Sequence, residues 1–189
     1  MDASAWLGRA GGAGVAPEIL ACIGRYGEDA LYEVGDGAFP TPRSWEMASR
    51  LLARADEPLR KRAVAAAVGA PAAERLWTFL TIYRRVDADR IIRRGEPMDF
   101  ADGPQAEPSF LYAAVFAVAA WLVGDASVTD AELPNIVRFA RSPGLDPEYQ
   151  FLFLRHLKRR PDLLARLKGV PAFRELAAQL VDLRLAVSR

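Results

Sequence analysis

Apolar residues recur at helical spacing along almost the whole chain, and no segment shows sustained alternation of apolar and polar residues. This pattern predicts an all-α multi-helix bundle in which short connections place neighbouring helices antiparallel. Prolines and glycines set the expected boundaries, because proline suits the first helical turn and glycine the position after the last. Helices are expected near residues 5–9, 17–26, 42–55, 57–68, 72–86, 88–94, 110–123, 130–140, 147–160 and 172–187.

Two short loops and one longer linker are expected between these helices. Residues 11–14 hold three glycines, and residues 33–40 hold two glycines and a proline, so both are predicted to be loops. Residues 87–108 combine one short basic helix with several prolines and glycines. We interpret 87–108 as a linker between an N-terminal helical half, 1–86, and a C-terminal set of antiparallel helices, 109–189.

Composition narrows the class of protein. With 51% hydrophobic residues the chain is expected to fold, and its net charge of +1 gives no general attraction to nucleic acid or to acidic membranes. The N-terminus lacks the basic and apolar regions of a signal peptide. The apolar run at 110–123 would extend about 21 Å as a helix, too short for a bilayer. These features predict a cytoplasmic protein without a membrane span.

The sequence offers few groups for catalysis. Cys22 is the only cysteine and His156 the only histidine, which excludes an internal disulfide and a Cys/His zinc site. Cys22 lies among apolar neighbours and is interpreted as a small buried residue. His156 is either a general base or a surface or interface histidine near a helix C-terminus, where the dipole favours a cation. We favour the second interpretation.

The glycines at 8, 11, 12 and 14 do not form a phosphate-binding loop. Such a loop follows a strand and ends in Gly-Lys-Ser/Thr, and neither feature is present. The chain is therefore not expected to be an enzyme, or to hold a cofactor or metal, on its own.

The densest cluster of basic residues spans the end of the N-terminal half and the short basic helix of the linker. It could hold nucleic acid phosphates, but it lacks interleaved aromatic residues and is better interpreted as solvated helix ends. Nucleic acid is therefore an unlikely partner. The cluster consists of Arg84, Arg85, Arg90, Arg93 and Arg94.

Arg43 is the most informative charged residue. It falls in the first turn of a helix that Thr41 is expected to cap, where a cation opposes the macrodipole at a cost of about 0.3–1 kcal/mol. Together with unpaired backbone N–H groups, a cation at this position makes a strong anion site. The alternative is an ion pair with a nearby carboxylate, Glu46 or Asp36. The two interpretations stand equal on physical grounds.

The segment FPTPRSW at residues 39–45 resembles the start of the sensor-2 helix in MoxR-type AAA+ ATPases. The Pro17-Glu18 helix start before it resembles that family's lid, and AVG at 67–69 followed by WTFLTIYR at 77–84 resembles the continuation in one bacterial branch. Pro171-Ala172-Phe173 resembles the C-terminal extension more loosely. The likeness covers most of the chain, and its specific motif is Pro40 to Trp45.

The resemblance implies a lid-like first half in which Arg43 reaches the γ-phosphate of ATP and Trp45 packs in the lid core. It also implies ATP and Mg²⁺ as ligands of a full ATPase, with an AAA+ core, neighbouring ring subunits and an unknown client protein as partners. The family's Walker A and B elements, sensor 1 and arginine finger are absent here. We therefore expect a non-catalytic lid region, either part of a longer ATPase or a separate protein.

The alternative function is a stand-alone helical adaptor that binds another protein through an apolar groove. The apolar helix at 110–123 and the aromatic residues Tyr149, Phe151 and Phe153 would line that groove. Both stretches are more simply interpreted as core, because an aromatic stripe at helical spacing usually packs inward.

Overall fold

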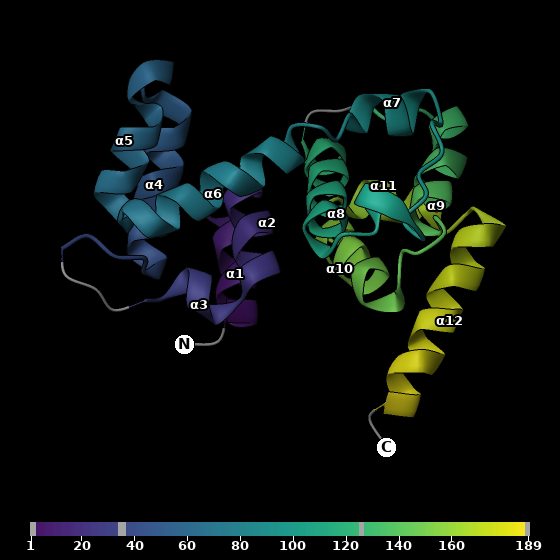
Figure 1. Ribbon diagram of the computed structural model, residues 1–189. Coiled ribbons are helices and arrows are strands. Elements are labelled where there is room, and N and C mark those ends of the chain that lie inside the picture. The colour runs from purple at the N-terminus through teal and green to yellow at the C-terminus, as the bar shows by residue number, and fades with distance from the viewer. Residues whose placement is uncertain (1–2, 34–36, 125–126, 188–189) are drawn as a thin grey trace. The chain divides into compact units, whose positions relative to one another are not determined.

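The computed structural model describes the backbone of residues 3–33, 37–124 and 127–187, and the side chains of these residues except 3–4 and 183–187. Throughout these ranges the regular structure is helical, and none of it is strand (Figure 1). The predicted all-α class is thereby confirmed. No helix in the same ranges is both long enough and apolar enough to cross a membrane.

The chain divides into two compact units, Met1–Arg85 and Val86–Arg189. The first unit contains six helices in its described residues. They are α1 (Ala3–Gly12), α2 (Pro17–Tyr26), α3 (Glu28–Leu31), α4 (Pro42–Arg54), α5 (Glu57–Val68) and α6 (Ala70–Tyr83).

The predictions for the first unit hold for α2, α4 and α5 and fail in detail elsewhere. Gly11 and Gly12, predicted as loop, form the last turn of α1, because a short run of glycines still continues a helix that is packed on its neighbour α2. Helix α3 was not predicted, since its four residues follow directly after Gly27. The predicted loop at 33–40 is non-helical at 33 and 37–40, and its remaining residues lie outside the described ones.

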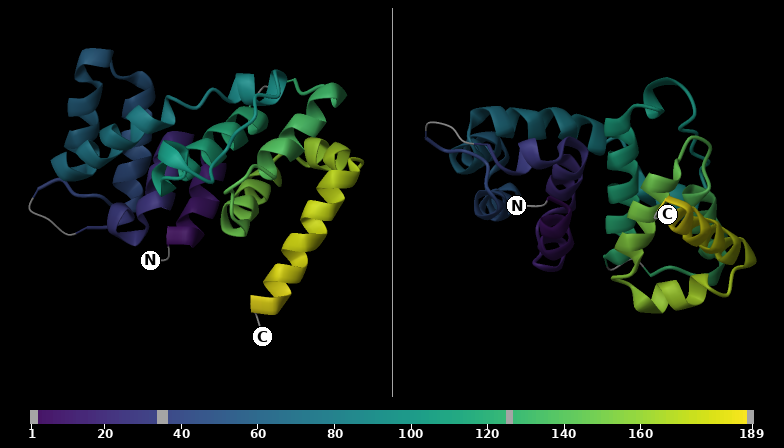
Figure 2. Two further views of the ribbon diagram at one scale, coloured as in Figure 1. Left: turned by 45° about the vertical axis from the view of Figure 1, so that its right-hand side comes forward. Right: turned by 90° about the horizontal axis from the view of Figure 1, so that it is seen from below.

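Helices α4 and α5 form an antiparallel hairpin that lies against α6 (Figures 1 and 2). Only Ala55 and Asp56 join the two helices. The core of this unit is made from one face of each helix and includes Ile19, Ile23, Trp45, Ala48, Val64, Val68, Leu76 and Phe79.

The second unit is built around α8 (Pro108–Val123). Ten of its side chains are buried, and they point in every direction around the helix axis, so neighbouring elements have to cover it on all sides. Helix α10 packs along it most extensively, and α7 covers another part. The other helices are α7 (Ala88–Arg93), α9 (Leu133–Ala140), α10 (Pro147–Leu157), α11 (Pro161–Leu167) and α12 (Pro171–Val187), with 3₁₀ turns at Gly103–Gln105 and Asp130–Glu132.

Two features of this unit differ from the sequence interpretation. Residues 87–108, predicted as a linker, group with the second unit and place Ile91, Ile92 and Phe100 in its core. The predicted helix at 147–160 ends at Leu157, and a separate helix, α11, begins at Pro161. Proline is favoured in a first helical turn, so Pro161 starts a new helix where the sequence analysis treated it only as a boundary.

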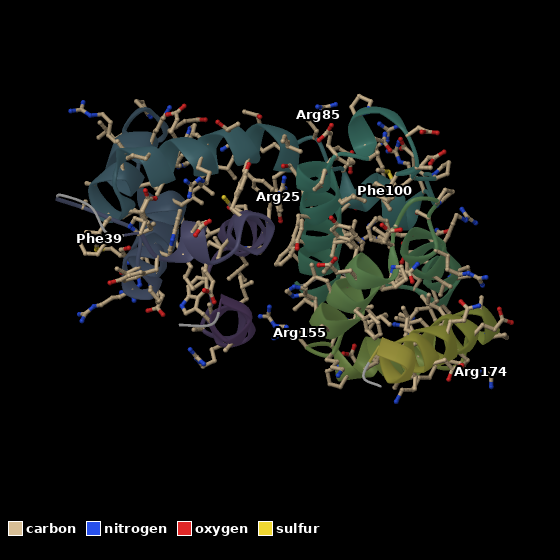
Figure 3. The ribbon with its side chains drawn as sticks, turned by 60° about the horizontal axis from the view of Figure 1, so that its bottom comes forward. Arg25, Phe39, Arg85, Phe100, Arg155 and Arg174 are labelled. Atoms are coloured by element: carbon tan, nitrogen blue, oxygen red, sulfur yellow. The ribbon has the colours of Figure 1, made fainter. Side chains whose placement is uncertain are left out.

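Phe100 is an anchor for the irregular segment between α7 and α8. Its side chain is 2% exposed and meets the rings of Phe110 and Phe139, and Figure 3 shows it among the helices of the second unit. The Phe100 N–H donates to the Pro143 carbonyl over 2.7 Å. Gly144 follows with φ +73°, and a Cβ there would overlap the Phe100 backbone. Only glycine fits this contact.

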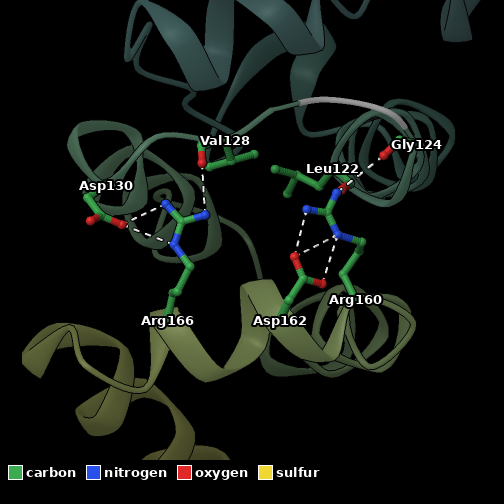
Figure 4. Close-up of polar contacts among 7 residues, drawn as sticks. All are labelled: Leu122, Gly124, Val128, Asp130, Arg160, Asp162 and Arg166. Atoms are coloured by element: carbon green, nitrogen blue, oxygen red, sulfur yellow. Dashed lines mark hydrogen bonds and ion pairs between the residues drawn. The ribbon is translucent and has the colours of Figure 1, made fainter.

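Two arginines bind backbone carbonyls around the connection between α8 and α9 (Figure 4). Arg160 directly precedes α11, and Arg166 lies within it. Arg160 donates to the carbonyls of Leu122 and Gly124, and Arg166 donates to the carbonyl of Val128 over 2.8 Å. Arg160 also pairs with Asp162, and Arg166 with Asp130. Hydrogen bonds from charged donors contribute about 1.5–3 kcal/mol each, so the two side chains fasten α8 and the start of α9 to α11.

The Gly144 contact predicts a difference between two glycines with the same backbone conformation. Gly144 (φ +73°) is crowded, whereas Gly103 (φ +72°) has open space where a Cβ would lie. Gly103→Ala should lower the free energy of unfolding by about 1 kcal/mol, the cost of a left-handed alanine. Gly144→Ala should lower it by about 1–3 kcal/mol more, because the backbone of Phe100 has to move. Urea unfolding followed by circular dichroism measures both, and equal losses would contradict the contact.

Candidate functional site

The start of α4 is fixed by a complete capping box. The Ser44 N–H donates to the Thr41 hydroxyl over 3.0 Å, and the Thr41 N–H donates to the Ser44 hydroxyl over 2.7 Å. Pro42 occupies the first helical position, where its missing N–H costs nothing. The Ser44 hydroxyl also lies 3.1 Å from the Phe39 carbonyl, to which it donates. The predicted Thr41 cap is confirmed, and the box leaves the first turn of α4 in a single defined position.

Trp45 anchors the same turn from inside. Its side chain is 1% exposed, and its indole N–H donates to the Ala30 carbonyl over 2.9 Å. Removal of a buried tryptophan costs about 3–5 kcal/mol, so this anchor is among the strongest in the unit. The prediction that Trp45 packs in the core is confirmed.

Gly69, between α5 and α6, packs against the segment that precedes α4. It has φ +83°, and a Cβ on it would overlap the carbonyl oxygen of Ala38. The segment before Thr41 therefore rests directly on the turn between α5 and α6. This contact was not predicted, because Gly69 was expected only to follow the helix at 57–68. The available signal was a lone glycine between two helices, a position that often requires a positive φ.

Arg43 occupies the second position of α4 and is exposed. Its guanidinium has no ion pair with any described residue, and Glu46, one of the two predicted partners, does not contact it. Asp36, the other predicted partner, lies outside the described residues. A free guanidinium beside a helix N-terminus can bind an anion such as a phosphate.

His156 is half-buried where α10 packs on α8, which fits the predicted interface position, but the cationic form expected there is not favoured. Its ring meets the Phe116 ring edge-on, with 4.5 Å between centroids. Burial, reinforced by the nearby charges of Arg159 and Arg155, lowers the pKa of His156 to about 4. The helix dipole is outweighed here, because the aromatic contact removes the ring from water. His156 is therefore neutral at pH 7 and packs against α8.

Cys22 fits its sequence interpretation. The thiol is 1% exposed, and burial raises its pKa to about 12, with Arg75 opposing the shift. A thiol that stays protonated is a poor nucleophile, so Cys22 serves packing in the first unit.

The basic cluster is partly neutralised. Arg90 pairs with Glu96, and Arg93 pairs with Asp89 and Glu132 while its guanidinium lies 5.1 Å from the centre of the Trp121 ring. Arg84 caps the C-terminal end of α6, where a cation is favoured by the dipole. These contacts are those of helix ends and salt bridges rather than of a continuous phosphate-binding surface.

The residues proposed to line an adaptor groove mostly form core. Phe110, in the first turn of α8, is 6% exposed, and Phe153 on α10 is fully buried. Helix α8 forms the centre of the second unit. Tyr149 is half-buried and meets Tyr112 edge-on. The simpler interpretation, as core, holds for most of α8 and for Phe153, whereas Tyr149 and Phe151 are half-buried.

An open depression of about 330 Å³ lies elsewhere in the second unit, between α9 and the start of α12. Its walls are largely apolar, and two arginines stand at its edge. Arg138 donates to the Gly95 carbonyl, and Arg141 pairs with Glu175. The lining residues are Pro134, Val137, Arg138, Arg141, Val170 and Ala172.

The described residues contain no cluster of three or more His, Cys, Asp or Glu side chains that could hold a metal ion.

Comparisons with known proteins returned no matching family model, no matching curated protein and no matching solved structure.

The environment of His156 predicts how the protein responds to acid. Because the folded pKa of about 4 lies below the ordinary 6.5, the unfolded chain takes up a proton that the fold does not between these pH values. Stability should therefore fall as pH drops from 6.5 towards 4, and His156→Gln should lack that part of the decline. The single histidine gives one set of ring signals in proton NMR. A titration midpoint near 6.5 would contradict the buried, neutral ring.

Proposed function

We propose that this chain is the non-catalytic lid region of a MoxR-like AAA+ ATPase, which closes over ATP and couples hydrolysis to remodelling of a partner protein. The observation that carries the proposal is the state of Arg43. Its guanidinium is exposed and has no ion pair with a described residue, while the turn that bears it is held rigidly by Thr41, Ser44 and Trp45. A cation opposing the helix dipole is costly without an anion, and a phosphate would remove that cost.

The described residues fit a nucleotide phosphate but not its metal ion. Arg43 supplies a bidentate donor for phosphate oxygens, and the first turn of α4 adds the positive end of its dipole. Mg²⁺ requires carboxylate and water oxygens, and no carboxylate lies in contact with Arg43 among the described residues. The metal and most of the nucleotide would therefore be held by an AAA+ core.

Arg43 would then act as a sensor rather than as a catalyst of bond cleavage. Its attraction to the nucleotide depends on the charge of the terminal phosphate, and this attraction weakens when that phosphate leaves. Because α4 is joined to α5 and α6 through a packed core, a shift at Arg43 would move the first unit as a body. Such movement is the means by which hydrolysis would reach a client protein.

A second candidate is a helical module that binds another protein without any nucleotide. The depression between α9 and α12 favours it, because its apolar walls and basic edge suit a protruding apolar side chain. This candidate takes the place of the groove predicted along α8, whose residues form core.

The lid proposal predicts a loss of ATP hydrolysis on neutralising one arginine. In the native polypeptide that carries this chain, Arg43→Ala should lower ATP turnover at least about tenfold, since the charge that stabilises the terminal phosphate is gone. Arg62→Ala is the matched control, because Arg62 is an exposed arginine on the adjacent helix α5 with no ion pair among the described residues. Turnover is measured by phosphate release, and folding by circular dichroism.

The size of that polypeptide decides between the two candidates. An immunoblot of source-cell lysate with an antibody against this chain should show a band about twice the 20.7 kDa of the chain, the size expected for a core and a lid. A band near 21 kDa with no ATPase bound to it would favour the protein-binding module. Unchanged turnover in Arg43→Ala would contradict the sensor role outright.

A further inference from the structure

The outer face of α4 carries a narrow basic stripe with an apolar side chain inside it. Arg43, Met47, Arg50 and Arg54 follow one another at intervals of four, three and four residues, which places all four on one face of the helix. The stripe extends over about 16 Å. It lies opposite the buried face, which is formed by Trp45, Ala48, Ser49 and Leu52.

Every member of this stripe is exposed. The three arginines are open to solvent, and Met47 is 48% exposed, one of four large apolar side chains that are so exposed in the described chain. None of the three arginines forms a salt bridge with a described residue. Arg93 on α7, Arg141 directly after α9 and Arg166 on α11 differ, because each of them pairs with a carboxylate.

The chemistry of the stripe identifies the kind of partner it suits. Three cations without a salt bridge to a described residue favour carboxylates or phosphates as ligands, but Met47 lies between Arg43 and Arg50, where a phosphate chain would bury an apolar group without benefit. Methionine and arginine together are enriched at protein–protein interfaces, and complementary charge sets the orientation of such contacts. The sole aromatic side chain of α4, Trp45, is buried, so α4 has no platform for stacking bases.

We propose that Met47, Arg50 and Arg54, the part of the stripe beyond the proposed phosphate site, form a docking surface for an acidic helix of a partner protein. The partner helix would carry carboxylates that face Arg50 and Arg54, beside an apolar side chain that packs on Met47. This inference goes beyond the lid function and does not depend on ATP, because Arg50 and Arg54 lie about two and three turns beyond the proposed phosphate site.

The test uses a photoreactive residue at the centre of the stripe. Met47→p-benzoylphenylalanine is introduced into the native protein in its source cell, and crosslinked peptides are mapped by mass spectrometry. The expected product joins residue 47 to a helical segment rich in Asp and Glu. Arg50→Glu with Arg54→Glu should lower the crosslink yield about tenfold, and about 0.5 M salt should lower it as well. Arg62→Glu, the matched reversal on α5, should leave the yield unchanged.

A charge swap between the stripe and its partner is the decisive experiment. When the carboxylates of the mapped segment are changed to lysine, the crosslink should return in the Arg50→Glu, Arg54→Glu protein and disappear in the parent. Circular dichroism melting curves verify that the variants fold. The proposal is overturned by an absent crosslink, a yield that ignores charge reversal, a product with nucleic acid, or a mapped segment without carboxylates. A failed sensor role for Arg43 would leave these results unaffected, so the two proposals fail separately.

Discussion

Helix α8 cannot exist in water by itself, and the second unit is arranged to enclose it. Its side chains are apolar around the whole circumference, so every exposed face would cost about 25 cal/mol for each Å² left in contact with water. Helix α10 packs along α8 most extensively, α7 packs on another part of it, and the Phe100 ring meets Phe110 in its first turn. The segment 87–108, with its prolines and glycines, takes an irregular path because it has to place Ile91, Ile92 and Phe100 at separate points of one core.

The first unit is organised around a different requirement, the position of one helix start. Trp45 ties the first turn of α4 to α3 from inside, the capping box orders its backbone, and Gly69 brings the α5–α6 turn against the segment before it. These contacts converge on a turn whose exposed residue is Arg43. A fold that orders a turn this thoroughly while leaving its arginine without a described partner fits a residue that awaits an anion from outside the unit.

The helical spacing of apolar residues and the positions of prolines and glycines were sufficient to predict the class of fold and most helices. The bounds of α5 follow from Pro58 near its start and Gly69 after its end, and Thr41 could be identified as a cap from residue type alone. The short helices α3 and α11 were not predicted, because α3 follows directly after Gly27 and α11 follows closely on the helix predicted at 147–160. His156 was expected to favour the cation because it lies near a helix C-terminus, whereas burial lowers its pKa, and its ring packs on Phe116, forty residues away in the chain. Arg43 was found from local sequence, but its lack of a described partner and the stripe it begins depend on tertiary structure.

The contacts of Arg160 and Arg166 show an asymmetry between donor and acceptor. The donors are guanidinium groups, which only arginine provides. The acceptors are the backbone carbonyls of Leu122, Gly124 and Val128, which any amino acid would provide. Substitution of Arg160 or Arg166 would therefore remove these hydrogen bonds, whereas a substitution at position 124 that keeps the backbone path would retain them. Two side chains at the start of α11 and near its end thus hold the connection between α8 and α9 without reading its side chains.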